Sequence, residues 1–201
     1  MTIGKDSLTV GDALARHYAA HGLPADGGES NPWFRVRIGP LTVRLPNPPA
    51  RQRAVFFHDV NHILTGYNTV FSDGEMVIAA FEVGTGCGRF GVAWFINLVM
   101  MAFGLVLRPR AIFHAFVRGR GCSSIYHCRE DRVELRTKTV GDLKTILALD
   151  QAVGGADLND RVWFLAWSVV AWVVTSSAAA AALALAWVVG ATIAAVARSV
   201  A

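Results

Sequence analysis

Three side chains of types that bind metal ions lie within one expected helical turn, at His58, Asp59 and His62. The two histidines are four residues apart, so on a helix their imidazoles lie on one face, about one turn apart. Glu75 follows after twelve intervening residues and could complete the site from a facing helix. Two imidazoles with carboxylates suit zinc, iron or manganese and leave coordination positions open for water or substrate. The spacing predicts a divalent metal site formed by these four residues.

The neighbours of the histidines indicate whether each pair is buried. A pair at helical spacing can lie on a solvated surface, and we interpret His17 and His21 in that way, because no carboxylate shares their turn. The turn around His58 differs, since apolar side chains flank it on two sides of the expected helix: Phe56, Phe57, Val60, Ile63, Leu64 and Tyr67. A polar stripe on a buried helix needs partners inside the protein, which favours a metal ion.

A further acid, Glu82, lies seven residues after Glu75, so the two share one face of the helix expected there. Glu82 is a second candidate carboxylate, either as a ligand or as a catalytic base, and a surface acid is the alternative interpretation. His58 and Asp59 are the other candidate catalytic residues. His58 is a candidate as a ligand of the metal, and Asp59 because a carboxylate beside the metal can move a proton.

The composition limits the class of protein. The 201 residues fit one domain with an appendage, and 53% apolar against 17% charged residues give a high mean hydropathy of +0.40. Three cysteines without a CxxC pair argue against a disulfide framework and favour a reducing compartment. No apolar run follows Lys5 and Asp6, so no signal peptide is expected. The net charge of +4, beside a membrane segment, predicts contact with anionic headgroups rather than nucleic acid.

The apolar excess is concentrated near the C-terminus. From Val162 to Ala197 no residue is charged, and this run far exceeds the roughly 20 residues that cross a bilayer. As one straight helix it would be about 54 Å long, against a hydrocarbon core of about 30 Å. We therefore favour a transmembrane helical hairpin over residues 161–198 that turns near Thr175, with one tilted span from about Ala171 as the alternative. Both ends of a hairpin, Arg161 and Arg198, would then lie on the same side of the membrane.

The rest of the chain predicts a mainly α fold, a helical bundle with a small β-hairpin, over residues 1–150, followed by a linker over 151–160. Glycines at 84–91 resemble a dinucleotide-binding loop, but no strand precedes them, so they predict a bend and close packing. The uncharged stretch 91–107 is marginal in length for a membrane span, and a buried helix or the lipid-facing wall of a groove fits it equally well. We expect helices over 8–22, 50–66, 112–118 and 140–149, and a helix that begins near Glu75 and includes Glu82. We also expect a hairpin at 33–45 with its turn at 39–40, and a short extended segment within 122–139.

The middle of the chain, from about Trp33 to Leu149, resembles the fourth coenzyme Q (ubiquinone) biosynthesis protein family. That family carries a His-Asp-x-x-His motif, then about eleven intervening residues, then Glu. Here His58, Asp59 and His62 match the motif, and Glu75 matches with one extra intervening residue. Because of that extra residue, Asp73 is an alternative ligand. The C-terminal membrane segment is not part of the family pattern.

The resemblance implies a helical fold, a divalent metal held by His58, Asp59, His62 and Glu75, and a groove for a long prenyl tail. It also implies that the ring carboxylate at C1 of a polyprenylated benzoquinone precursor is replaced by a hydroxyl. The partners would be that precursor, membrane lipids and other quinone biosynthesis enzymes. The location would be the cytoplasmic side of the bacterial cytoplasmic membrane.

Two other functions fit part of the pattern. A non-catalytic scaffold that binds prenyl lipids would need the groove and the basic residues but not the metal. A metal-dependent phosphohydrolase would need further histidine and aspartate residues downstream, where only His114 and His127 remain. A membrane di-iron hydroxylase is disfavoured, because six histidines fall short of the usual clusters.

Overall fold

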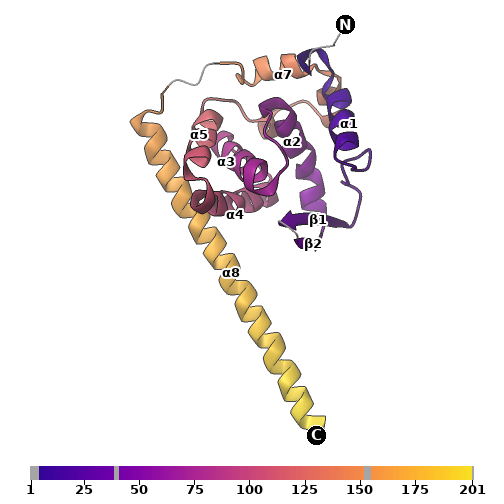
Figure 1. The fold of residues 1–201 in the computed structure, drawn as a ribbon, viewed down its shortest axis with the longest axis vertical. Helices are drawn as coiled ribbons and strands as arrows, with labels where there is room; N and C mark the ends of the chain where they lie inside the picture. The colour runs from indigo at the N-terminus through magenta and orange to yellow at the C-terminus, as the bar shows by residue number, and fades with distance from the viewer. Residues whose placement is uncertain (1–4, 39–40, 152–154, 201) are drawn as a thin grey trace.

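The computed structural model describes residues 5–38, 41–151 and 155–200, which form a helical domain and one long projecting helix (Figure 1). The predicted mainly α class with a small hairpin is confirmed. The elements in chain order are η1 (Lys5–Ser7), α1 (Val10–Ala20), β1 (Trp33–Ile38), β2 (Leu41–Pro46), α2 (Pro49–Thr65), η2 (Phe71–Glu75), α3 (Met76–Thr85), α4 (Gly91–Leu107), α5 (Pro109–Arg120), η3 (Ile125–His127), α6 (Arg132–Thr137), α7 (Val140–Ile146) and α8 (Leu158–Val200).

Helix α3 lies at the centre of the domain, with α2, α4 and α5 around it (Figure 1). Every residue from Met76 to Val83 is buried, as expected for a helix that is apolar on all sides. Gly84 of α3 and Gly119 of α5 allow these two helices to pack closely. A Cβ at Gly84 would lie 2.3 Å from the carbonyl oxygen of Phe116, and a Cβ at Gly119 would lie 2.2 Å from that of Phe81. The prediction of close packing at the first of the 84–91 glycines therefore holds.

Helix α2 has the burial that its sequence predicts. Pro49 occupies its first turn, where a missing N–H costs nothing, and Gly66 ends it in the left-handed conformation with φ 76°. Its buried residues include the polar Asn61 and His62 beside apolar ones. The helix therefore carries a polar stripe into the interior.

The β-hairpin forms as predicted, with β1 and β2 antiparallel in a register that pairs Trp33 with Pro46 and Arg35 with Arg44. The expected turn at residues 39–40 lies outside the described residues. Helix α4 over residues 91–107 is buried in the domain on one face, as the buried-helix interpretation predicts, and its other face is apolar and exposed.

Two expectations are wrong. Residues 161–198 do not form a hairpin, since α8 is one continuous helix through residues 175–177. No Gly or Pro interrupts that region, and the alanines that follow favour helix, so nothing turns the chain there. The extended segment expected within 122–139 is instead η3 and α6. Asp131 caps the start of α6 in a capping box with Glu134. Among the described residues of 122–139, the β-type pairing is a single bridge between Thr139 and Thr9.

Candidate metal centre

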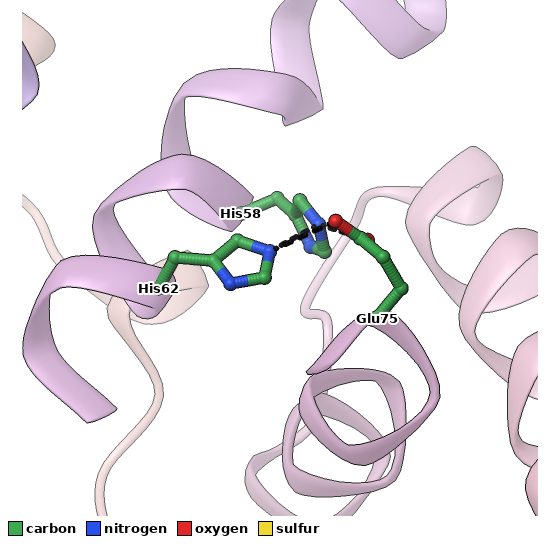
Figure 2. Close-up of side chains that lie close together, drawn as sticks. All are labelled: His58, His62 and Glu75. Atoms are coloured by element: carbon green, nitrogen blue, oxygen red, sulfur yellow. Dashed lines mark hydrogen bonds and ion pairs between the residues drawn. The ribbon is translucent and has the colours of Figure 1, made fainter. Parts of the chain in front are cut away.

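Helix α2 and the turn η2 bring three potential ligands together (Figure 2). The Nε2 atoms of His58 and His62 lie 3.2 Å apart, because the residues are one helical turn apart on the same face. The carboxylate of Glu75 faces both rings, with Oε2 3.2 Å from Nε2 of His58 and Oε1 3.4 Å from Nε2 of His62. The ligand atoms of all three residues lie within 4.8 Å of one another. This group could hold a metal ion.

The second nitrogen of each imidazole is bound from behind. Nδ1 of His58 lies 3.1 Å from Oε1 of Glu82, and Nδ1 of His62 lies 2.9 Å from the backbone carbonyl oxygen of Tyr67. Histidines that bind metals are typically held in this way, by a carboxylate or a carbonyl that fixes the tautomer and the ring orientation. Both Nε2 atoms are thereby directed towards Glu75.

Glu82 is enclosed by hydrogen-bond donors. Its side chain is fully buried, and its two oxygens accept hydrogen bonds from Asn61 (2.8 Å), Asn97 (2.6 Å) and the Tyr126 hydroxyl (3.0 Å), besides contacting His58. A buried carboxylate is tolerated when it is bonded in this way. The candidate base Glu82 therefore lies behind His58, where it orients the ring and has no exposed surface for a substrate.

The imidazole of His58 and the carboxylates of Glu75 and Glu82 stabilise one another's charged forms. Burial alone would lower the pKa of His58, but the carboxylates of Glu82 and Glu75 outweigh it and raise that pKa well above its ordinary value. Burial would raise the pKa values of both glutamates, but the two histidines lower the pKa of Glu75, and His58, Asn61 and Asn97 lower that of Glu82. Two ionised carboxylates beside the imidazoles provide the negative charge that a divalent cation requires.

Asp59 and Asp73 have other partners. Asp59 accepts a hydrogen bond of 2.9 Å from the Tyr18 hydroxyl of α1, and burial raises the pKa of its carboxyl. Asp59 is not among the three residues whose ligand atoms converge. Asp73 is exposed and forms an ion pair with Arg108, so Glu75, not Asp73, faces the histidines. The turn η2 that precedes α3 is π-helical, and such a turn holds about one more residue than an α-helical turn.

A hollow of about 420 Å³ opens beside the metal group, between α1 and the segment after α2. His62 and Tyr67 line it on one side, and Arg16, His17 and His21 line it on the other. His21 is exposed, as predicted for a surface pair, but His17 is half-buried and its ring stacks near that of His62, with centroids 6.2 Å apart. Sequence spacing gave no signal for this contact, because α1 and α2 are far apart in the chain.

The donor set fits a divalent transition metal, since two imidazoles and one carboxylate are the ligands of many zinc and iron sites with open positions. Within the part of the chain that the structure describes, His114 and His127 contribute to no second group of this kind. Comparisons of the chain with protein-family models, curated protein sequences and solved structures find no match.

Proposed function

We propose that this protein is a membrane-attached, divalent-metal-dependent enzyme that acts on a polyprenylated benzoquinone precursor. The observation that carries the proposal is the convergence of His58, His62 and Glu75, with Glu82 and the Tyr67 carbonyl holding the two rings from behind. Such an arrangement is typical of a metal site that is oriented in advance. The neighbouring hollow is lined in part by His62.

The reaction is suggested by the sequence resemblance, namely replacement of the ring carboxylate at C1 by a hydroxyl. In balanced form, the ionised carboxylate leaves as carbon dioxide, and water supplies the new hydroxyl and one proton. Dioxygen accepts the two electrons, that proton and one more proton from the solvent, and becomes hydrogen peroxide. A divalent cation held by His58, His62 and Glu75 would supply a Lewis acid for this chemistry. In the proposal Asp59, which follows His58 in the chain and accepts a hydrogen bond from Tyr18, moves the proton.

The long helix supports attachment to a membrane. Among the described residues, α8 is the one helix long and apolar enough to span a bilayer. In the proposal it anchors the domain to the cytoplasmic face of a bacterial membrane, where a prenylated substrate would be dissolved. The alternative is a non-catalytic carrier of the same lipid, for which the exposed apolar face of α4 gives a specific reason.

The test is to purify the full-length protein in detergent, measure its metal content by mass spectrometry and analyse its bound lipids. The wild-type protein should hold about one divalent ion per chain, whereas His58→Ala and His62→Ala should lose it. His21→Ala is the matched control, because it removes an exposed histidine that is not among the three residues whose ligand atoms converge. The proposed function also expects a prenylated ring in the lipid extract.

The outcomes separate the alternatives. Retention of the ion by a His58→Ala, His62→Ala double variant would exclude this site. Loss of the ion with unchanged quinone production in cells would favour the carrier. Hydrolysis of phosphate esters without binding of a prenylated ring would favour a phosphohydrolase.

A further inference from the structure

The position of α8 relative to the domain determines where a bilayer would begin. The positions of α8 that are buried or half-buried against the domain recur every three or four residues and end at Ala178: Asp160, Phe164, Trp167, Ser168, Ala171, Val174, Thr175 and Ala178. The contact includes a parallel stack of Trp94 on Trp167, with ring centroids 4.9 Å apart, and an ion pair of 2.8 Å between Arg120 and Asp160. Helix α8 is therefore fastened to α4 and α5 up to residue 178.

Beyond this contact α8 is wholly exposed and uncharged until Arg198. Residues 179–197 number nineteen, which gives a helix about 28 Å long. This length matches the hydrocarbon core of a bilayer, about 30 Å. No spacer separates the last contact with the domain from the first residue of this apolar length, so a bilayer that covers residues 179–197 reaches the domain itself.

The part of the domain nearest to this exit is apolar. Helix α4 and the β-hairpin lie along the edge of the domain past which α8 projects (Figure 1). Helix α4 has no charged residue, and four large apolar side chains are exposed along it: Phe95, Phe103, Val106 and Leu107. An uncharged helix with aromatic and aliphatic side chains in solvent marks an interaction surface.

The hairpin adds aromatic and basic side chains at the same edge. Arg35 and Arg44 are partners across the two strands, and Trp33 lies two residues before Arg35, so the three share one face of the hairpin. All three are exposed. Tryptophan and arginine are the residues that position proteins at the headgroup layer of a membrane, the first by its amphipathic ring and the second by attraction to anionic lipids.

We infer that the edge of the domain formed by the outward face of α4 and the β-hairpin lies on the surface of an anionic lipid bilayer. Phe95, Phe103, Val106 and Leu107 enter the boundary between headgroups and acyl chains. This inference rests on the proposed insertion of α8, because that helix brings the bilayer to this edge. The occupant is lipid and not a second copy of the chain, since a bilayer must lie where residues 179–197 begin.

The inference is tested by the collision accessibility of nitroxide labels on the full-length protein in liposomes of phosphatidylcholine with anionic phosphatidylglycerol. Each label is placed on a single introduced cysteine in a Cys122→Ser, Cys128→Ser background, in which buried Cys87 remains. Phe103→Cys reports on α4. Ile146→Cys is the matched control, because α7 lies at the opposite edge of the domain from α4 (Figure 1). The two positions are almost equally exposed, Ile146 at 52% and Phe103 at 50%. Leu183→Cys reports on α8 itself.

Dissolved oxygen concentrates in lipid, and a nickel chelate stays in water. The label at Phe103 should collide several-fold less often with the nickel chelate than the label at Ile146, and more often with oxygen. A label at Phe103 that is as accessible to nickel as the one at Ile146, while the label at Leu183 is shielded, overturns the inference and leaves membrane anchoring intact. If Leu183 is also accessible to nickel, the proposed anchoring itself is wrong.

A second variant separates lipid from a protein partner. Phe103→Glu together with Val106→Glu should leave α8 embedded but make a label at Phe95→Cys several-fold more accessible to the nickel chelate. Shielding of Phe103 in detergent, with a measured mass of two chains per particle, would instead assign this edge to a second copy and contradict the inference.

Discussion

Oε1 of Glu82 lies 3.1 Å from Nδ1 of His58, the ring nitrogen that does not face Glu75. This relationship makes Glu82 a positioning residue, because it acts on a prospective ligand from behind and not on a substrate. Asn61 donates a hydrogen bond to the same oxygen, and Asn97 and the Tyr126 hydroxyl both donate to Oε2. The orientation of His58 therefore depends on a network that spans α2, α3, α4 and η3.

Replacing Glu82 with Gln should weaken metal binding without removing a ligand. The amide nitrogen of Gln would face donors, so that the rear hydrogen bond to His58 is lost or reversed. Loss of such a partner typically reduces metal affinity about 10- to 100-fold. A competition titration with a chromophoric chelator measures the affinity. Tyr126→Phe is the matched control, since it removes one donor to Glu82 and leaves His58 bonded; equal affinities for wild type and E82Q would contradict the positioning role.

Because Glu75 and not Asp73 faces the histidines, replacing these two acids should affect the metal content differently. Glu75→Gln should lower the metal content severalfold, because it removes the charged ligand that faces both histidines. Asp73→Asn should leave the metal content unchanged, because it breaks only the exposed pair with Arg108, and such pairs contribute about 0–1 kcal/mol. Mass spectrometry of the purified variants measures the bound metal. A lower metal content in D73N would show that the π-helical turn rearranges when metal binds.

The metal-free protein should be most stable between about pH 5 and 6. The pKa of His58 is raised on folding, so its stabilising contribution is complete below the ordinary value of 6.5 and is lost as the pH rises through the raised value. The pKa values of Glu75 and Glu82 are lowered on folding, so their contributions are present above 4.5 and are lost as the pH falls. Calorimetry after removal of metal by a chelator measures the unfolding temperature. His58→Ala should flatten this maximum, and an unchanged profile would mean that other groups produce it.

The contact of α8 with the domain predicts that a larger side chain lowers the stability of the protein at some positions of the helix and not at others. Ala171 is fully buried where α8 packs on the domain, whereas Ala179 is exposed beyond the contact. Ala171→Leu should destabilise the protein by about 1–3 kcal/mol through overpacking. Ala179→Leu should change the stability by less than about 0.5 kcal/mol. Urea unfolding in detergent, followed through tryptophan fluorescence, compares the two, and equal effects would show that the helix is not packed at Ala171.

The parts of the fold and site that could be predicted are those that depend on nearby residues. His58 and His62 share a face because helical geometry fixes a spacing of four, and the β-hairpin follows from alternation along Trp33–Ile38. Contacts between distant segments could not be predicted. The bond from Tyr18 to Asp59 and the enclosure of Glu82 depend on how α1, α4 and η3 pack, and no local pattern encodes that packing.

The course of α8 also depends on packing that the sequence pattern does not reveal. Its uncharged length suggested two crossings of a bilayer, but a turn requires residues that leave the helix, and residues 175–177 do not. The excess length is instead used by the domain, which covers one side of α8 as far as Ala178.

All three prospective ligands come from residues 58–75, a short and continuous part of the chain. A cation bound to them would close a small loop, and closing a small loop costs little chain entropy. The ion would therefore act as a local cross-link between the end of α2 and the start of α3. Its removal should loosen the segment from Tyr67 to Gly74 first, while the interior around α3 and α5 stays protected from hydrogen exchange.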